Sequence, residues 1–417
     1  MEKKYAALIA IDWADKKHDI LIEDCKKGTH KTMVLSHNAE SIDQWVKQLS
    51  KQYSGKLAIV SEQTKGALLN ALLKYDCFDI YPVNPATLAK YRKAFTPSGA
   101  KDDPTDAAFM LEILKKHSDR LECLRLDSDE TRMLQILVEK RRGLVEDKKR
   151  LGNRLTSLLK EYYPLVLKLF PTMGRSILCK FIQAYPTLEN IKVASEQEII
   201  EFFRSSHSGG TARLQARLEL IDTEIPITQD SAIIKTYSLV AQSLAAQILT
   251  LIEQIDIFDT EIEKIYQKHQ DFKLFDSLPA SGSILAPRLV AALGSNRDRF
   301  KSVEHLLNSS GISPVLIRSG NQCYVRYRCW CSQFTRQSFH EWAACTIRYS
   351  AWARAFYAMQ KANGKTHSVA IRALAYKWIR ILFKLWKDNK TYDEAIYILA
   401  LQKRKSPIIK FMAENSF

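Results

Sequence analysis

Glycine and proline are scarce in this chain of 417 residues. They number 14 and 12, and their combined share is about half of the ~12% found in average proteins. This scarcity excludes a turn-rich all-β fold, a collagen-like repeat and low-complexity disorder. Because 46% of the residues are hydrophobic, we expect a globular, mostly helical protein of two or three domains.

Long apolar runs are missing as well. The run at residues 5–11 follows two lysines, but it ends at Asp12 and lacks a small-residue cleavage site, so we expect no export signal. The longest uncharged stretch, residues 236–252, contains six Ser, Thr and Gln residues and is too polar to span a bilayer. We therefore expect a cytoplasmic protein with no membrane partner.

The eight cysteines are scattered through the chain, as is typical of reduced thiols in a cytosolic protein. Three of them, Cys323, Cys329 and Cys331, lie near His340. Their spacing fits no usual zinc finger. We interpret them as packing thiols and expect no zinc.

Positive charge is concentrated in the last quarter of the chain. The net charge is +16, and residues 301–417 contain 19 Lys or Arg against 6 Asp or Glu, which is +13. Aromatic residues are interleaved with these cations, namely Tyr324, Tyr327, Trp330, Phe334, Phe339, Trp342, Tyr349, Trp352, Phe356, Tyr357, Trp378 and Trp386. Cations beside stacking rings favour a nucleic-acid partner. A helical domain with an apolar core and a solvated basic face explains the same pattern, and both interpretations can hold together.

The first 120 residues alternate between strand and helix patterns. Apolar runs predict strands at residues 6–11, 18–23, 31–36, 56–61 and 78–83. Helical patterns lie at residues 41–51, 65–75, 86–94 and 103–117. Three strands followed by strands and helices in turn predict an α/β sheet domain.

Two long helices are predicted after this domain. Residues 129–163 carry a leucine at every seventh position from Leu137 to Leu158, and Pro164 ends the helix. Residues 234–265 carry apolar side chains at alternating spacings of three and four, which is typical of a coiled coil. This seam fits an intramolecular hairpin with the 129–163 helix and an intermolecular contact equally well. A smaller helical segment, residues 165–230, contains a Ser- and Gly-rich linker at 205–210.

Four acidic residues lie where an α/β nuclease needs them. Asp12 and Glu62 each follow a buried strand, and Asp103 and Asp106 share one face of a helix. Four carboxylates at close quarters repel unless they hold cations such as Mg²⁺ or Mn²⁺. Two ions of this kind stabilise the attacking and leaving oxygens of phosphodiester transfer. Taken alone, Asp103 and Asp106 are also ordinary residues of a helix start.

The segments IAIDWADKKHD, AIVSEQTKG, YPVNPA and SGAKDDPTDA resemble the DEDD insertion-sequence transposases. That family includes the Piv/MooV invertases and the bridge-RNA-guided recombinases. The resemblance implies a RuvC-like, ribonuclease-H-like N-terminal domain. By motif, the four metal-binding catalytic acids are then Asp12, Glu62, Asp103 and Asp106.

The resemblance continues downstream. Residues 278–282, Leu-Pro-Ala-Ser-Gly, resemble the "PGIG" opening of the family's transposase domain, although Ala280 stands where its first glycine is expected. The blocks at 311–314 and 318–320 resemble its "GL-P…SG" motif, although the glycine-rich turn that commonly follows is missing. The serine before the glycine is the family's nucleophile, and here it is Ser319.

From the residues alone, Ser319-Gly320 is an ordinary turn, and the resemblance is what suggests a catalytic serine. A serine needs activation, and neighbouring arginines are able to neutralise the attacked phosphate. Ser281 and Ser283 lack the Arg-Ser-Gly context. The residues that we expect to bind nucleic acid are Lys101, Arg318, Arg326, Arg328 and Arg336.

These observations predict three domains: a catalytic RuvC-like domain at 1–122, a helical coiled-coil region at 123–270 with the inserted segment 165–230, and a basic, mostly helical transposase domain at 271–417. The expected function is that of a DNA transposase or recombinase of a mobile element. By resemblance, its partners are donor and target double-stranded DNA, an element-encoded guide RNA and further copies of the chain. A hydrolytic metal-dependent junction nuclease and a non-catalytic nucleic-acid-binding coiled-coil protein are the alternatives.

Overall fold

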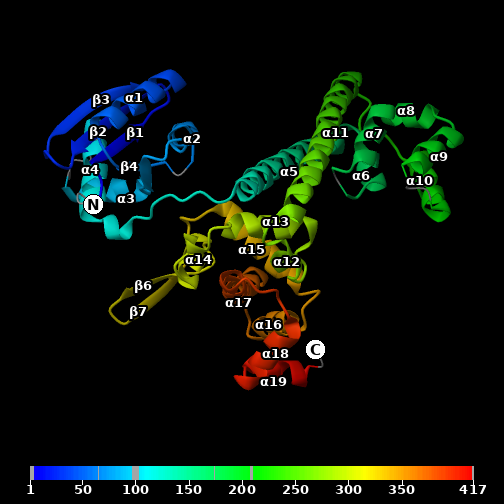
Figure 1. The fold of residues 1–417 in the computed structure, drawn as a ribbon. Helices are drawn as coiled ribbons and strands as arrows, with labels where there is room; N and C mark the ends of the chain where they lie inside the picture. The colour runs from blue at the N-terminus through cyan, green and yellow to red at the C-terminus, as the bar shows by residue number, and fades with distance from the viewer. Residues whose placement is uncertain (1–3, 64, 96–102, 173, 207–209, 416–417) are drawn as a thin grey trace. The chain divides into compact units, whose positions relative to one another are not determined.

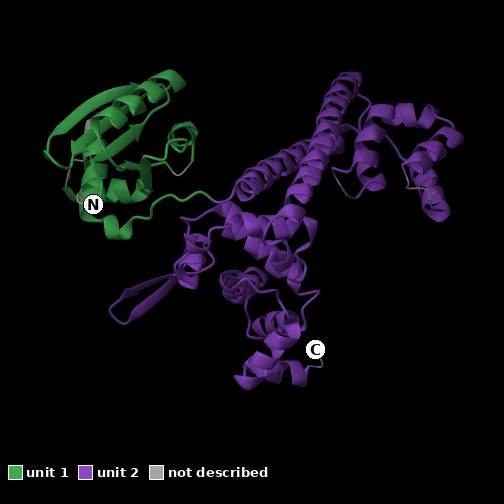
Figure 2. Cartoon of the chain, viewed as in Figure 1, with its two compact units in different colours: residues 1–126 green, residues 127–417 purple. Residues whose placement is uncertain are grey.

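The computed structural model describes residues 4–63, 65–95, 103–172, 174–206 and 210–415. The chain divides into two compact units, residues 1–126 and residues 127–417 (Figure 2). The division into three domains that the sequence suggests is finer than this and stays a prediction.

Unit 1, residues 1–126, is built on a five-stranded sheet. Its strands are β1 (Ala7–Trp13), β2 (Lys17–Asp24), β3 (His30–Ser36), β4 (Leu57–Ser61) and β5 (Phe78–Pro82). They lie in the order β3-β2-β1-β4-β5 (Figure 1). Strands β1, β2 and β3 pair antiparallel, and β4 and β5 run parallel to β1. All five strands lie within a residue or two of the predicted ranges, so the prediction of an α/β domain is confirmed.

Helices cover both faces of this sheet. They are α1 (Ala39–Gln52), α2 (Ala67–Leu72), α3 (Pro85–Phe95) and α4 (Asp103–Lys116), followed by a short 3₁₀ turn, η1 (Ser118–Arg120). Side chains alternate along a strand, so Ile9 and Ile11 of β1 pack with α1 and α2, whereas Leu8 and Ala10 pack with α3 and α4. Helix α4 is therefore the element that covers the second face of β1.

Unit 2 is organised around two long helices, α5 (Asp129–Tyr162) and α11 (Ser231–Lys268), which pack against each other (Figure 1). Ser128 and Asp230 cap their N-termini through side-chain oxygens. The apolar stripe of α11, with Leu244, Ile248 and Ile255 among its buried members, is used inside the chain. The sequence pattern fitted an intramolecular and an intermolecular contact equally well. The structure shows the intramolecular one, in which α11 packs against α5 of the same chain.

A charged residue interrupts the predicted leucine seam of α5 for a specific reason. Arg141 forms a two-point ion pair with Asp259 of α11, with Nη2 at 2.8 Å from Oδ2. This ion pair lies between two separate hydrophobic clusters, which pack on opposite halves of α5 and α11. The two helices therefore join two cores within unit 2.

One of the two clusters is formed with the helices that lie between α5 and α11 in the sequence. They are α6 (Leu165–Leu169), α7 (Ser176–Ala184), α8 (Leu188–Val193), α9 (Glu196–Ser205) and α10 (Thr211–Thr223). Pro164 separates α5 from α6, as predicted. Half of the predicted linker at 205–210, residues 207–209, lies outside the described residues.

The second cluster contains the C-terminal helices. They are α12 (Phe272–Asp276), α13 (Gly282–Leu293), η2 (Arg297–Arg299), α14 (Val303–Ser309), α15 (Gln333–Thr346), α16 (Ala351–Ala362), α17 (His367–Asp388), α18 (Glu394–Lys403) and α19 (Pro407–Glu414). One hairpin, β6 (Val315–Ser319) and β7 (Gln322–Arg326), interrupts them. The sequence pattern did not predict this hairpin.

Most of the aromatic residues of this region form the core. Trp342, Trp352, Trp378 and Trp386 are completely buried. Trp352 and Trp378 lie with ring centroids 4.6 Å apart. The prediction that these rings stack on nucleic-acid bases is therefore wrong for the buried ones. It stays a prediction for exposed rings such as that of Trp330.

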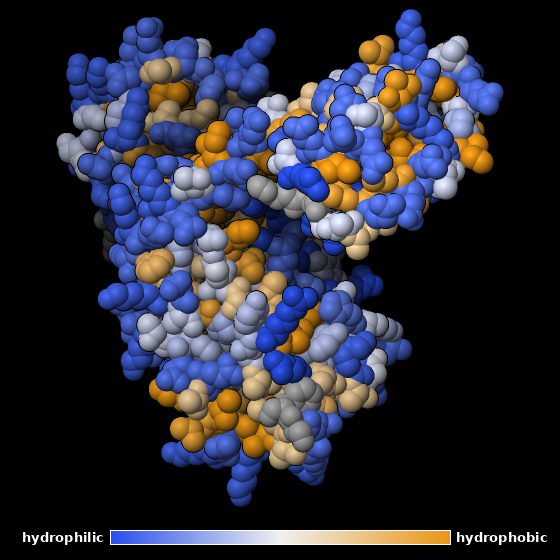
Figure 3. All heavy atoms as spheres, turned by 90° about the vertical axis from the view of Figure 1, so that its right-hand side faces the viewer, coloured by the Kyte–Doolittle hydropathy of each residue, from blue (hydrophilic) through white to orange (hydrophobic). Residues whose placement is uncertain are grey.

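Hydrophobic side chains also reach the surface in places. The lower part of Figure 3 shows such a patch at the C-terminal helices, where α18 exposes Ile396 and Leu399. Within the described residues, one helix, α11, is long and apolar enough to cross a membrane by length and composition. Its apolar stripe packs against α5 and α7, as in the core helix of a globular unit.

Candidate active site

Asp12 and Glu62 lie at the same edge of the sheet in unit 1. Strands β1 and β4 are parallel neighbours, and their last paired residues are Ile11 and Ser61. Asp12 and Glu62 each come one residue later in the chain, so both lie where the carboxyl ends of the two strands meet. Both side chains are partly exposed, which leaves them accessible to a ligand from solvent.

Helix α4 brings the other two acids toward this edge. Lys115, near the end of α4, binds Glu23 of β2 with Nζ 2.6 Å from Oε1, and Glu23 pairs with Leu8 near the start of β1. The nine residues from Lys115 back to Asp106 span about 14 Å of helix, and the four from Leu8 to Asp12 span about 13 Å of strand. Since α4 covers β1, its first turns lie on the Asp12 side of the sheet.

Asp106 is paired with a residue that the sequence did not single out. Arg92 of α3 donates from Nε to Oδ1 at 2.6 Å and from Nη2 to Oδ2 at 2.5 Å. The Asp106 side chain is 3% exposed and that of Arg92 is 15% exposed. Asp106 therefore acts as more than a favourable charge at a helix start, because it anchors a two-point ion pair between α3 and α4.

The chemistry of these acids fits Mg²⁺ or Mn²⁺, which are hard cations that prefer carboxylate oxygens. Among the side chains that the structure describes, no three or more His, Cys, Asp or Glu side chains converge as a formed metal cage. The description covers Asp12, Glu62 and Asp106 but not the side chain of Asp103, and Lys101 lies outside it. The donor types fit a metal, while Asp106 is engaged by Arg92.

A further acid, Asp19, was missed in the sequence analysis. It pairs with Asp12 across β1 and β2 and is partly buried as well. Like charges directly opposite each other destabilise a sheet, so a cation bound beside Asp12 and Asp19 would lower the repulsion between them. The signal was present in the sequence, because a short turn between two predicted strands sets Asp12 opposite Asp19.

Ser319 occupies the end of the β6–β7 hairpin in unit 2. It is the last residue of β6 and pairs with Gln322, so Gly320 and Asn321 form a two-residue turn. Gly320 has φ +57°, and glycine takes that backbone region without strain. The sequence prediction of a turn at Ser319-Gly320 is confirmed, and the Ser319 side chain is exposed.

The four arginines expected to contact nucleic acid divide into two pairs. Arg318 and Arg326 are exposed on the hairpin. Arg328 and Arg336 brace its base instead: Arg328 donates to Asn308 Oδ1 at 3.0 Å, and Arg336 donates to the Arg328 carbonyl at 2.6 Å. The hairpin thus presents one exposed cation near its tip, Arg318, and another, Arg326, at the opposite end of its strands, where it pairs with Val315. Two further arginines hold the orientation of the hairpin.

The cysteines of this region need a correction. Cys323 and Cys329 are exposed, and Cys331 is partly exposed. The interpretation of Cys323 and Cys329 as packing thiols is therefore wrong. For Cys323 the physical reason is that all five residues of β7 are exposed, whereas Cys329 lies in the segment that follows β7.

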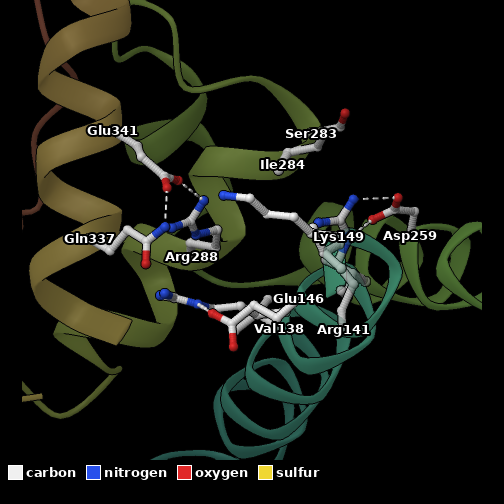
Figure 4. Close-up of a pocket in the computed structure, with 13 residues that line it drawn as sticks. Val138, Arg141, Glu146, Lys149, Asp259, Ser283, Ile284, Arg288, Gln337 and Glu341 are labelled. Atoms are coloured by element: carbon white, nitrogen blue, oxygen red, sulfur yellow. Dashed lines mark hydrogen bonds and ion pairs between the residues drawn. The ribbon is translucent and has the colours of Figure 1, made fainter. Parts of the chain in front are cut away.

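A polar cavity of about 400 Å³ lies where α5, α11, α13 and α15 meet. Figure 4 shows Lys149 extending into it, beside the ion pairs Arg141–Asp259 and Arg288–Glu341. In the second pair, Nη1 lies 2.5 Å from Oε2. Since carboxylates balance most of the cations that line it, the cavity is a structural junction of four helices.

Comparison with known proteins matches both ends of the chain. A family model described as a transposase of the DEDD IS110 type covers residues 9–164, and a second, described as a transposase of the IS116/IS110/IS902 family, covers residues 272–358. The chain belongs to the IS110 family of DEDD transposases. The first match contains all four acids, and the second contains Ser319.

Individual relatives of this IS110-family chain agree with the family models. The mini-circle protein named as a transposase for IS117 of Streptomyces coelicolor is 23% identical over 94% of this chain and 97% of its own length. An uncharacterized 43.6 kDa protein of IS110 from the same organism is 25% identical over 71% of this chain and 73% of its own length. An uncharacterized 42 kDa protein of IS900 from Mycobacterium paratuberculosis is 24% identical over 71% of this chain.

Family membership implies an enzyme of a mobile element that acts on DNA, cutting and transferring strands. DEDD transposases generally depend on divalent metal ions, which agrees with the oxygen donors at the edge of the sheet. The Arg92–Asp106 pair adds a feature of this chain that the motif alone does not contain.

Proposed function

We propose that this transposase is a recombinase that cuts and rejoins DNA through a covalent phosphoserine intermediate. The observation that carries the proposal is the placement of α4, whose first turns lie on the side of the sheet where Asp12 and Glu62 end their strands. Four acids from β1, β4 and α4 then form one RuvC-like site.

In this proposal, Asp12, Glu62, Asp103 and Asp106 hold Mg²⁺ or Mn²⁺. The ions supply Lewis-acid stabilisation of the charged phosphate oxygens. The protein's part is to orient the four carboxylates. Strand ends and a packed helix do this better than mobile loops, because their backbones are held by neighbouring elements.

Ser319 is the proposed nucleophile. Its Oγ forms a bond to the phosphorus while the bond from phosphorus to the 3′ oxygen breaks, and that oxygen leaves as a 3′-hydroxyl after taking a proton. A 3′-hydroxyl of the partner strand then attacks the phosphoserine and releases Oγ. One phosphodiester replaces another, so exchange needs no external energy source. Exposure at the end of a hairpin supports this role, because the hydroxyl is accessible to a DNA strand.

The proposed partners are donor and target double-stranded DNA, with a structured guide RNA from the element. The exposed Arg318 and Arg326 supply cations for the phosphate backbone, and base pairing by the RNA supplies sequence recognition. The protein works in the bacterial cytoplasm at the nucleoid. Purifying it from its host and sequencing the bound nucleic acid tests the RNA, and recovery of only random cellular RNA contradicts that part.

Conversion of each acid to its amide tests the metal site. We expect Asp12→Asn, Glu62→Gln, Asp103→Asn and Asp106→Asn each to lower Mg²⁺-dependent strand cleavage by about 10²-fold or more, while DNA binding is retained. The measurement is cleavage of a plasmid that carries the ends of the element. Asp15→Asn, an exposed acid in the turn before β2, is the matched control. Full cleavage by the Asp12→Asn protein contradicts the proposal.

A trapped covalent adduct separates the recombinase from its alternatives. End-labelled DNA should remain on the protein in a denaturing gel, and Ser319→Ala should abolish the labelled band while Ser283→Ala retains it. Cleavage without an adduct indicates a hydrolytic junction nuclease. Binding without any cleavage indicates a non-catalytic nucleic-acid-binding protein.

A further inference from the structure

Arg92 gives the acidic site a cation that belongs to the protein. A buried carboxylate is strongly unfavourable without a partner, and the Asp106 side chain is 3% exposed. Arg92 meets this need by donating one hydrogen bond to each oxygen, at 2.6 and 2.5 Å. Both oxygens of a predicted metal ligand are thus already engaged.

We infer that Arg92 and the divalent metal compete for Asp106, so that metal binding displaces the Arg92 guanidinium. The inference rests on the proposed function, since it takes Asp106 as a metal ligand. A metal bound at about 2.0–2.1 Å has to share both oxygens with Arg92, which takes one lone pair of each. Because the Asp106 side chain is 3% exposed, its remaining lone pairs are not open to solvent while Arg92 is in place. Two cations on one carboxylate also repel each other at low dielectric.

The surroundings of the pair indicate which partner moves. Asp106 lies in the second turn of α4, and its neighbour Ala107 is buried in the core. Arg92 lies in the last turn of α3, and its side chain is the more exposed of the two. A long, flexible arginine near the surface is able to swing outward, whereas a short aspartate on a packed helix is held in place. Arg92 is therefore a positioning residue that holds the orientation of the Asp106 carboxylate before the metal arrives.

Direct measurement of metal affinity tests the competition. Mn²⁺ binding to the full-length protein is followed by the electron paramagnetic resonance signal of free Mn²⁺, without DNA. We expect Arg92→Gln to bind Mn²⁺ at least about tenfold more tightly than the wild type, because no ion pair has to be broken. Arg92→Lys should fall between the two, since it keeps the charge but loses the two-point contact.

The matched control is Lys93→Gln, which removes an exposed positive charge from the next position of α3 and should leave Mn²⁺ affinity within about twofold of the wild type. Unchanged or weaker binding by Arg92→Gln overturns the competition. If the Arg92→Gln protein does not fold, the Nε–H resonance of Arg92 in the wild-type protein provides the test. We expect this resonance to shift, and its proton to exchange faster with water, when Mg²⁺ is added. An unaltered resonance at saturating Mg²⁺ overturns the inference.

Failure of the underlying function is recognised separately. Mn²⁺ binding to the wild type that is undiminished by Asp12→Asn and by Asp106→Asn shows that these acids are not metal ligands, and both proposals then fail. Binding that these variants abolish, together with no gain in Arg92→Gln, overturns only the inference about Arg92.

Discussion

Buried and half-buried charges in unit 1 are compensated in different ways. Glu23 is buried, which by itself raises its pKa, but hydrogen bonds from Lys115 and His30 hold the pKa below its usual value. Asp106 has Arg92. Asp12 lies opposite a second acidic residue, Asp19, across β1 and β2. The residue with a like-charged neighbour is thus one of those proposed to bind a cation.

His18 makes stability depend on pH at the residue scale. Its side chain is completely buried, and burial, followed by the nearby His37, lowers its pKa to about 4 from the usual 6.5. Between these values the unfolded chain binds a proton that the folded protein does not. Above pH 6.5, His18 therefore does not reduce the free energy of unfolding. As the pH drops toward 4, protonation of His18 in the unfolded chain lowers this free energy by up to about 3 kcal/mol.

Urea unfolding across pH 4–7 measures this effect. The variant His18→Gln should lose less stability on acidification than the wild type, although it is less stable at pH 7 because it leaves the His37 contact, 2.9 Å from His18 Nε2, unmade. Parallel loss of stability in the two proteins contradicts the assignment to His18.

Ala280 has a backbone conformation that suits glycine. It stands where the family motif has its first glycine, and its φ is +58°. A left-handed conformation costs a non-glycine residue about 1–2 kcal/mol. We expect Ala280→Gly to increase the free energy of unfolding by about 1 kcal/mol, after allowance for the greater freedom of glycine in the unfolded chain.

Thermal denaturation measures the Ala280→Gly effect. The control is Ala291→Gly inside α13, which should destabilise the protein because glycine costs about 1 kcal/mol in a helix interior. An equal loss of stability in both variants contradicts the prediction.

At the scale of elements, the β6–β7 hairpin separates two kinds of arginine. Arg318 and Arg326 are exposed, whereas Arg328 and Arg336 hold the base of the hairpin. We expect Arg318→Gln and Arg326→Gln each to reduce the slope of log K for DNA binding against log salt by about 0.9, the value for one phosphate contact.

DNA-binding titrations between 50 and about 200 mM salt measure these slopes. Lys390→Gln changes an exposed cation outside the hairpin and serves as the control for overall charge. Slopes that are equal in the two hairpin variants and the wild type contradict a DNA contact through the exposed arginines of the hairpin.

At the scale of the whole molecule, the two units carry different parts of the proposed chemistry. The acids lie in residues 1–126 and Ser319 lies in residues 127–417. Exchange between two duplexes requires four strand cuts, which one serine and one set of acids do not provide. We therefore propose a dimer or tetramer in which Ser319 of one protomer completes the metal site of another.

Mixing two inactive variants tests composite sites. Ser319→Ala and Asp12→Asn proteins should each be inactive, and a mixed assembly should regain part of the wild-type cleavage, because one composite site then contains both intact partners. The measurement is plasmid cleavage after the proteins are mixed and allowed to exchange subunits. If every protomer builds its own site, no cleavage returns in the mixture.

Local sequence patterns were sufficient to predict most elements of the secondary structure in unit 1 and the two long helices of unit 2. Apolar runs and helix caps depend on neighbouring residues, so the five strands of unit 1 and the helices α5 and α11 were predicted to within a few residues. The apolar run at residues 6–11 placed Asp12 at the end of a buried strand, and the four acids were candidates from their positions at strand ends and on one helix face before the family motifs assigned them. Ser319 became a candidate only through the motif, because a motif keeps its spacing along the chain.

Contacts between residues that are distant in the sequence depend on the tertiary fold. The pairs Arg92–Asp106 and Arg141–Asp259 join segments 14 and 118 positions apart, and no local pattern contains that information. The same holds for the heptads of α11, whose apolar stripe has no feature that distinguishes a partner in the same chain from one in another. The interleaved tryptophans became core for the same reason, because burial depends on the helices that pack around a residue and these helices are assembled only in the fold.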